Sequence, residues 1–316
     1  MADAAEGLRG DGSPTGPPLV GPPLSGAFSS GPMGGGGHLA ENLRVFSSNR
    51  FALAGAIFLA FALLFSFLGP LFYHTNQVAA NLLVENAVPS RAHLLGTNPE
   101  GFDIVGQLML GGQSTLEVAL AVAALATTFG ALWGAVSGFV GGVLDAFMMR
   151  IVDAMLSIPF LFFVVLLAAL VQPSLTIIIL AIAAVSWLST ARLVRGEVLS
   201  LRTRDYVAAA RCFGSGPWKI ILRHLLPNAL GVLVVNATLK VADAILTFAS
   251  ISFLGLGIPP PATSWGQTLT TGIDNLFDGY WWQLWPAALM IVCSVIAVNV
   301  MGDGFRDVVE KRLQRR

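Results

Sequence analysis

Charged residues are scarce in this chain of 316 residues. They make up 11% of the sequence, whereas apolar residues make up 55%. A soluble surface needs more charge than this, so the composition is typical of a membrane protein. The 18 basic and 18 acidic residues balance to a net charge of zero. That balance gives no overall field that would attract nucleic acid.

Cysteine, lysine and histidine are also rare, and their positions argue against several kinds of site. The two cysteines, Cys212 and Cys293, lie far apart, which argues against a disulfide scaffold or a zinc site. None of the three lysines follows a glycine, so the Gly-Lys-Ser/Thr of a phosphate-binding loop is missing. The four histidines do not pair with carboxylates at metal-binding intervals, and no Gly-x-Ser-x-Gly elbow occurs. The sequence therefore predicts no catalytic residues and no metal site, which argues against a membrane enzyme.

Long apolar segments are what the chain does have. At about 1.5 Å per helical residue, a segment of about 20 residues crosses the apolar core of a bilayer. Six segments qualify: Phe51–Tyr73, Leu116–Val140, Ala154–Val171, Leu175–Leu193, Ala229–Leu256 and Leu284–Met301. The sequence thus predicts an all-α, polytopic membrane protein with six transmembrane helices. The three residues after Val171 predict a tight turn between the third and fourth spans.

The basic residues predict how the chain is oriented. With both termini in the cytoplasm, all but two of the 18 basic residues fall on the cytoplasmic side. The exceptions are Arg91, in an outer loop, and Lys240, within a span. Because basic loops stay on the cytoplasmic side, we expect this orientation.

Three regions are expected along the chain. Residues 1–46 are rich in glycine and proline and predict a disordered cytoplasmic tail. Residues 47–310 hold the six spans, with a large cytoplasmic loop at residues 200–228. Residues 311–316 form a basic cytoplasmic tail.

Ionisable residues near membrane depth are few. Lys240 and Asp243 lie three residues apart, so they share one helix face and can neutralise each other. Such a pair is either structural or cavity-lining, or it belongs to an ion relay. Asp145, Arg150 and Asp153 cluster near the short inner turn, where mutual pairing is the simplest expectation.

Aromatic residues gather in the expected outer loop before the sixth span. They are Trp265, Tyr280, Trp281, Trp282 and Trp285. Tryptophan and tyrosine favour the headgroup layer, so membrane anchoring is the first interpretation. Because prolines at 259–261 would stiffen this loop, a docking ledge or lid is the alternative.

The cytoplasmic loop predicts a helix, a glycine break and a second helix. Asp205–Phe213 is rich in alanine, with Thr203 as the expected N-cap. The Gly-Ser-Gly-Pro that follows ends this helix. Trp218–Leu225 then predicts an amphipathic helix that ends before Pro227. A hairpin of this kind can enter a groove on a soluble partner, or lie on anionic lipid.

This loop resembles the EAA motif of bacterial ABC importer permeases. In that motif a triplet, three further residues, a glycine, nine more residues and a short stretch ending in Leu-Pro follow one another at fixed spacing. Here the triplet is 208–210, the glycine is Gly214, and residues 224–228 read His-Leu-Leu-Pro-Asn, as in the peptide/nickel subfamily. Other matches lie at residues 94–97, 141–153, 186–195, 252–257, 264–266 and 299–307. Together they cover roughly residues 50–310 and are similar to DppC/OppC permeases of peptide importers.

The chain departs from the family pattern at several positions. Ala208 replaces the usual glutamate of the triplet, so Asp205 is the candidate to supply that contact. Asn98 follows the outer Gly-Thr where an aspartate is usual. Phe248 stands where a glutamate is common, and the pair Lys240 and Asp243 is unusual for the family.

The resemblance implies a type I ABC importer permease fold in a bacterial cell membrane. It implies four kinds of partner: a DppB-like second permease, two cytoplasmic ATPases, an extracytoplasmic binding lipoprotein, and membrane lipid. ATP and Mg²⁺ would bind the ATPases, and no cofactor would bind this chain. The cargo would be a dipeptide, an oligopeptide or a metal chelate.

The resemblance also assigns candidate residues. For coupling to the ATPases they are Asp205, Tyr206, Ala208, Ala209, Ala210, Arg211, Gly214, His224, Pro227 and Asn228. For the translocation path they are Lys240, Asp243 and Phe248. The competing hypothesis is a stand-alone secondary transporter or channel that uses Lys240 and Asp243.

Overall fold

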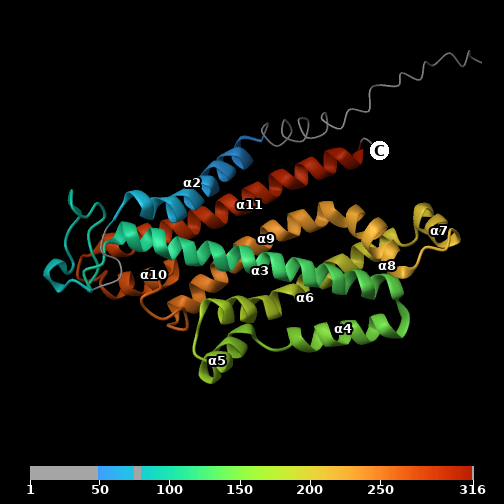
Figure 1. The fold of residues 1–316 in the computed structure, drawn as a ribbon, viewed down its shortest axis with the longest axis horizontal. Coiled ribbons are helices and arrows are strands. Elements are labelled where there is room, and N and C mark those ends of the chain that lie inside the picture. The colour runs from blue at the N-terminus through green and yellow to red at the C-terminus, as the bar shows by residue number, and fades with distance from the viewer. Residues whose placement is uncertain (1–48, 75–79, 315–316) are drawn as a thin grey trace, which may run out of the picture.

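A computed structural model describes residues 49–74 and 80–314 (Figure 1). Across these residues the regular elements are helices, apart from one isolated bridge between Thr97 and Asp103. The α-helices are α2 (Arg50–Phe72), α3 (Ile104–Val140), α4 (Gly142–Leu156), α5 (Phe160–Leu170), α6 (Leu175–Leu201), α7 (Asp205–Cys212), α8 (Pro217–Ile220), α9 (Leu226–Phe253), α10 (Trp265–Asp274) and α11 (Trp285–Gln314). The shorter elements are η1 (Leu82–Val84), the π-helical η2 (Ile221–Leu225) and η3 (Trp281–Gln283). The expected tail at 1–46 lies outside the described residues, and α11 continues into the expected tail at 311–316.

Five helical stretches are long and apolar enough to cross a membrane. They are Arg50–Phe72, Ile104–Val140, Leu175–Leu201, Pro217–Phe253 and Trp281–Val308. These stretches confirm five of the six predicted spans, although most extend beyond the predicted limits. The α3 helix, for example, begins 12 residues before Leu116, because Asp103 caps its N-terminus by accepting a hydrogen bond from the Gly106 N–H.

The third predicted span is not one continuous helix. Residues 154–171 contain the end of α4, a break, and the 11 residues of α5. The break follows from Pro159, which disfavours helical backbone at Ile158 and stands at the N-cap of α5. Together α4 and α5 lead the chain from the end of α3 back to the start of α6, and α4 lies on the side of α6 away from α3 (Figure 1).

The long helices run lengthwise through the molecule and leave two distinct ends. At one end lie α7, α8 and the turn from α3 to α4, and at the other lie α10 and the segment before α3 (Figure 1). The α3 helix packs along both α6 and α9, and α11 packs between α9 and α2. This arrangement puts the loop at residues 200–228 and the expected outer loops at opposite ends.

Glycines allow α3 and α6 to approach backbone to backbone. Gly130, Gly134 and Gly138 are spaced by four residues and face α6. A Cβ at Gly134 would stand 2.3 Å from the carbonyl oxygen of Ala191, and one at Gly130 would stand 2.7 Å from that of Trp187. This is the small-residue seam through which membrane helices gain close packing.

Candidate functional site

The loop at residues 200–228 forms a short helix and a sharp turn at one end of the bundle. The α7 helix ends at Cys212, and Gly214 follows with a φ of +73°. This left-handed conformation favours glycine because it has no Cβ. The side chains of Phe213 and Trp218 flank the turn and are 89% and 60% exposed. Two large apolar groups thus project from this end.

The inner side of the loop is anchored to the bundle. Val207 is fully buried and Ala210 is 8% exposed. Both belong to one apolar cluster with residues from α3, α6, α8, η2 and α9. The Arg211 guanidinium lies 5.0 Å from the ring centroid of Phe139 on α3, a distance that favours cation–π attraction. The exposed side of the loop therefore sits on a fixed base.

Two details of the predicted loop are wrong. Thr203 does not cap α7, because its hydroxyl donates to the Ser200 carbonyl and Arg204 occupies the N-cap position. The second helix is not separate from the next span, because α8, η2 and α9 form one helix over Pro217–Phe253. Pro227 does not interrupt it, since it lies in the first turn of α9 and the backbone before it widens into the π-helical η2.

The structure places the predicted coupling residues in three settings. Asp205, Tyr206, Ala208, Ala209, Arg211 and Gly214 are exposed on or beside α7, with Tyr206 at 38%. Ala210 faces inward with the buried cluster. His224, Pro227 and Asn228 lie along η2 and α9, where the Asn228 side chain donates to the His224 carbonyl at 2.6 Å. Partial burial raises the pKa of the Tyr206 phenol, so this side chain is neutral at physiological pH.

An ion-pair brace beside the loop joins α4 to α6. Arg195 donates from two nitrogens to both carboxylate oxygens of Asp145, at 2.6 and 2.7 Å. Ser137 also donates to Asp145, and Arg192 pairs with Asp153 at 2.5 Å. The predicted mutual pairing of Asp145, Arg150 and Asp153 is therefore wrong for both carboxylates. Their partners lie on a helix that sequence spacing alone does not bring near.

The Lys240–Asp243 pair forms as its spacing predicts, with Nζ and Oδ2 3.0 Å apart. The Lys240 side chain is 12% exposed and that of Asp243 is 64% exposed, so the pair reaches one surface of α9. Phe248 lies elsewhere: it is fully buried in the main apolar cluster of the bundle. The structure therefore does not bring the three path candidates together on one face.

At the opposite end, two tryptophans expected as membrane anchors are buried instead. Trp265 is fully buried, and its indole N–H donates to the Leu108 carbonyl at 2.9 Å. Trp282 is 6% exposed and packs beneath the outer loop, near the Thr97 carbonyl. Trp281 and Trp285 are about half exposed, as the anchor interpretation expects. The buried pair holds α10 to α3 and η3 to the segment before α3, because each indole N–H is aimed at a backbone carbonyl there.

The segment before α3 is tied down by its own polar residues. Asp103 is 1% exposed, and its carboxylate accepts from Tyr73 and contacts the His93 ring, both at 2.9 Å. The Gln283 side chain donates to the Thr97 carbonyl at 3.0 Å. The Gly-Thr motif is thereby fixed against η3. The sequence identified the Gly-Thr motif but not these hydrogen bonds, because Gln283 lies 186 residues after Thr97 in the chain.

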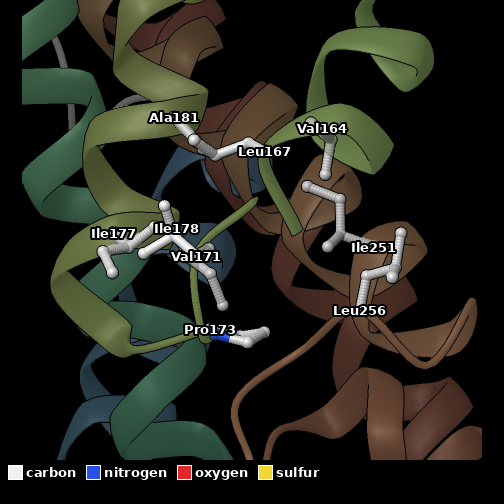
Figure 2. Close-up of a pocket in the computed structure, with 9 residues that line it drawn as sticks. All are labelled: Val164, Leu167, Val171, Pro173, Ile177, Ile178, Ala181, Ile251 and Leu256. Atoms are coloured by element: carbon white, nitrogen blue, oxygen red, sulfur yellow. The ribbon is translucent and has the colours of Figure 1, made fainter. Parts of the chain in front are cut away.

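Two recesses lie beside the end of α9. The first is a small apolar hollow of about 20 Å³, bordered by α5, α6 and α9, with Val164, Ile178 and Ile251 among its walls (Figure 2). The second, of about 420 Å³, has both polar and apolar walls and lies between the loop after α9 and α10; we call it the polar recess. Pro173 borders both. Across the described residues, no group of three His, Cys, Asp or Glu side chains is placed to hold a metal ion.

Two family models match separate parts of the chain. Residues 126–315 match the model of the binding-protein-dependent transport system inner membrane component. The chain belongs to this family. Residues 39–89 match the N-terminal transmembrane domain of oligopeptide transport permease C. Members of the family are the non-catalytic permease subunits of ABC transporters, so this permease is not an enzyme.

Curated relatives cover nearly the whole permease. The Bacillus subtilis dipeptide transport system permease protein DppC is 36% identical over 272 residues, which are 86% of this chain and 85% of the relative. The Haemophilus influenzae OppC is 37% identical over 271 residues, 85% of this chain and 87% of the relative. The Escherichia coli probable D,D-dipeptide transport system permease protein DdpC is 36% identical over 260 residues, which are 82% of this chain and 87% of the relative. These matches support the DppC/OppC resemblance and favour it over the stand-alone transporter.

Proposed function

We propose that this permease is one of two membrane subunits of an ATP-driven peptide importer. The names of its relatives support dipeptides or oligopeptides as cargo. A DppB-like second permease would complete the pathway, and a binding lipoprotein would deliver peptide from outside. Two cytoplasmic ATPases would bind ATP and Mg²⁺, with no cofactor on this chain.

The α7–Gly214–α8 loop is the surface that docks on the ATPases. The observation that carries this proposal is its two-sided construction. Val207 and Ala210 fix one side to the bundle, while Phe213 and Trp218 project from the other. A short helix with exposed apolar groups fits a groove on a partner. Because its base is continuous with α9, a displacement of the loop moves a membrane helix.

The end that carries α7 faces the cytoplasm in this proposal. Arginines at 202, 204, 211 and 223 and a lysine at 219 gather there, and basic segments stay on the cytoplasmic side. Both termini then lie in the cytoplasm, and α10 and the Gly-Thr loop face outward.

Copurification is the first test. We expect the tagged permease, extracted in mild detergent from its native host, to bring down a second six-span permease and ATPases with Walker motifs. Recovery of this chain alone, with peptide uptake that survives loss of every candidate ATPase, would contradict the proposal.

A glycine pair tests the role of the loop. Gly214→Val places a β-branched residue at positive φ, which distorts the turn. Gly216→Val is the control, because Gly216 has a φ of −66° and a Cβ there meets nothing within 4 Å. We expect Gly214→Val to lower peptide uptake by roughly tenfold or more while ATP hydrolysis and membrane insertion persist. Unchanged uptake in Gly214→Val, or an equal loss in both variants, would remove the hinge role.

Asp205 is proposed to supply the charge that Ala208 lacks. Asp205 is exposed in the first turn of α7, and Ala208 is exposed three residues later on the same helix. Asp205→Asn should weaken ATPase attachment, and adding Ala208→Glu should restore it. Attachment that is insensitive to Asp205→Asn would show that the contact is made elsewhere.

A further inference from the structure

The polar recess at the end opposite α7 has no charged residue among its lining side chains. Its polar groups are Ser252, Gln267, Thr270 and Thr271, and its remaining walls are glycines, prolines and Ile258. Its cavity volume of about 420 Å³ lies within the range of about 300–1,000 Å³ usual for ligand sites. A neutral ligand that makes hydrogen bonds suits such walls better than a charged one.

Two of these polar groups are buried without a partner. Ser252 is 2% exposed, and neither its hydroxyl oxygen nor the side-chain carbonyl oxygen of Gln267 has a hydrogen-bond partner in the structure. An unpaired buried polar group costs free energy, so such groups usually have a ligand or water to satisfy them. One can donate and the other can accept. A peptide group presents the matching pair, a carbonyl oxygen and an N–H.

The walls of the recess are held in place by close packing. Trp265 anchors α10 to α3, and a Cβ at Gly266 would stand 2.4 Å from the Ala249 carbonyl on α9. Gly257 leaves room beside Ser252, because a Cβ there would stand 2.8 Å from its hydroxyl oxygen. The Ser-Trp-Gly motif at 264–266 thus fixes Gln267 and Ser252 in the wall of the same recess. A site on rigid elements holds its polar groups ready for a ligand.

From these observations we propose that the recess is a subsite for the peptide bond of the cargo. Ser252 donates to the peptide carbonyl, and Gln267 accepts from the peptide N–H. The subsite makes hydrogen bonds to the peptide backbone and none to the side chains, so peptides of different sequence can pass. This inference rests on the proposed function, because it assumes peptide cargo.

The test compares a dipeptide with its N-methylated counterpart, which lacks the peptide N–H. Uptake is measured in vesicles that hold the full complex and its binding protein. We expect Gln267→Met to lower uptake of the dipeptide roughly fivefold, as for one neutral hydrogen bond. The same variant should leave uptake of the N-methylated peptide near the wild-type rate, because that bond is already missing. Since the binding protein is unchanged, its own preference cancels from the variant-to-wild-type ratios.

A serine pair supplies a matched control. Ser252→Ala should lower dipeptide uptake by a similar factor, whereas Ser250→Ala, on the exposed side of α9, should not. Wild-type uptake by Gln267→Met and Ser252→Ala overturns the subsite. An equal loss of uptake for both peptides also overturns it, because that result shows a structural role. A loss of the ATP hydrolysis that the binding protein stimulates without peptide overturns it as well, because that result shows a protein-docking surface. A wild-type complex that imports another solute and no peptide overturns the proposed function itself.

Discussion

Gly134 offers a quantitative test of the contact between α3 and α6. Replacing it with alanine adds one methyl group, which would stand 2.3 Å from the Ala191 carbonyl oxygen and 2.9 Å from the Arg195 nitrogen. Both atoms belong to the backbone of α6 and cannot rotate away. The helices must therefore separate locally by about 1 Å to reach normal contact distance.

The free-energy cost of this clash can be isolated by comparing Gly134→Ala with a second glycine variant in the same helix pair. Gly196 lies on α6 with open space around its Cβ position, so Gly196→Ala gains helix propensity of up to about 1 kcal/mol without a clash. Gly134→Ala gains the same propensity but also carries an overpacking cost of about 1–3 kcal/mol. The difference between the two variants isolates the clash, because the propensity term cancels.

Thermal unfolding of the purified complex provides the assay. At about 2–4 °C per kcal/mol, Gly134→Ala should melt several degrees below Gly196→Ala. Arg195, whose backbone faces the new methyl group, should also lose part of its bidentate contact with Asp145. If Gly134→Ala were as stable as Gly196→Ala, α3 and α6 would not approach as closely as the structure describes.

Three further predictions concern the two ends of the bundle. In a Cys293→Ala background, a membrane-impermeant maleimide should label the exposed Cys212 in inverted vesicles and not in right-side-out ones, and the opposite pattern would reverse the proposed orientation. Trp265→Phe should lower the free energy of unfolding by about 1–3 kcal/mol, since it removes the indole hydrogen bond to the Leu108 carbonyl and leaves a void where the buried indole stood, and a melt unchanged from wild type would contradict that anchor. Burial, with the hydrogen bond to Asp103 and its charge, raises the pKa of Tyr73 from 10.0 to about 12. The stability that wild type holds over Tyr73→Phe should thus be full below pH 10 and disappear as the pH rises to about 12, which alkaline unfolding would measure.

Local sequence features predicted the parts of the fold that depend on neighbours in the chain. Apolar runs located five spans, and the glycine at 214 located the turn in the loop at residues 200–228. The spacing of Lys240 and Asp243 predicted their ion pair, because both lie on one turn of a helix. The break at Pro159 was also visible in the sequence, but the apolar run around it masked the signal.

Features that depend on distant segments could not be read in this way. Asp145 was expected to pair within its own turn, yet it binds Arg195, 50 residues away. Trp265 is of a residue type typical of membrane anchors. It is buried instead, because its indole N–H finds an acceptor in the Leu108 carbonyl on α3, 157 residues earlier. In each case the helix packing decides the partner, and the sequence pattern contains no measure of that packing.

The uninterrupted helix from Pro217 to Phe253 has a mechanical consequence. Its 37 residues make a rod of about 55 Å that begins at the loop proposed to dock on the ATPases and ends one residue past Ser252. A helix resists compression along its axis, so force applied at one tip is felt at the other. In the proposed importer, nucleotide binding by the ATPases and the contact with cargo at Ser252 would therefore act on the same helix. Lengthening this helix by one residue would rotate its far tip by about 100° and disconnect the two events without touching either site.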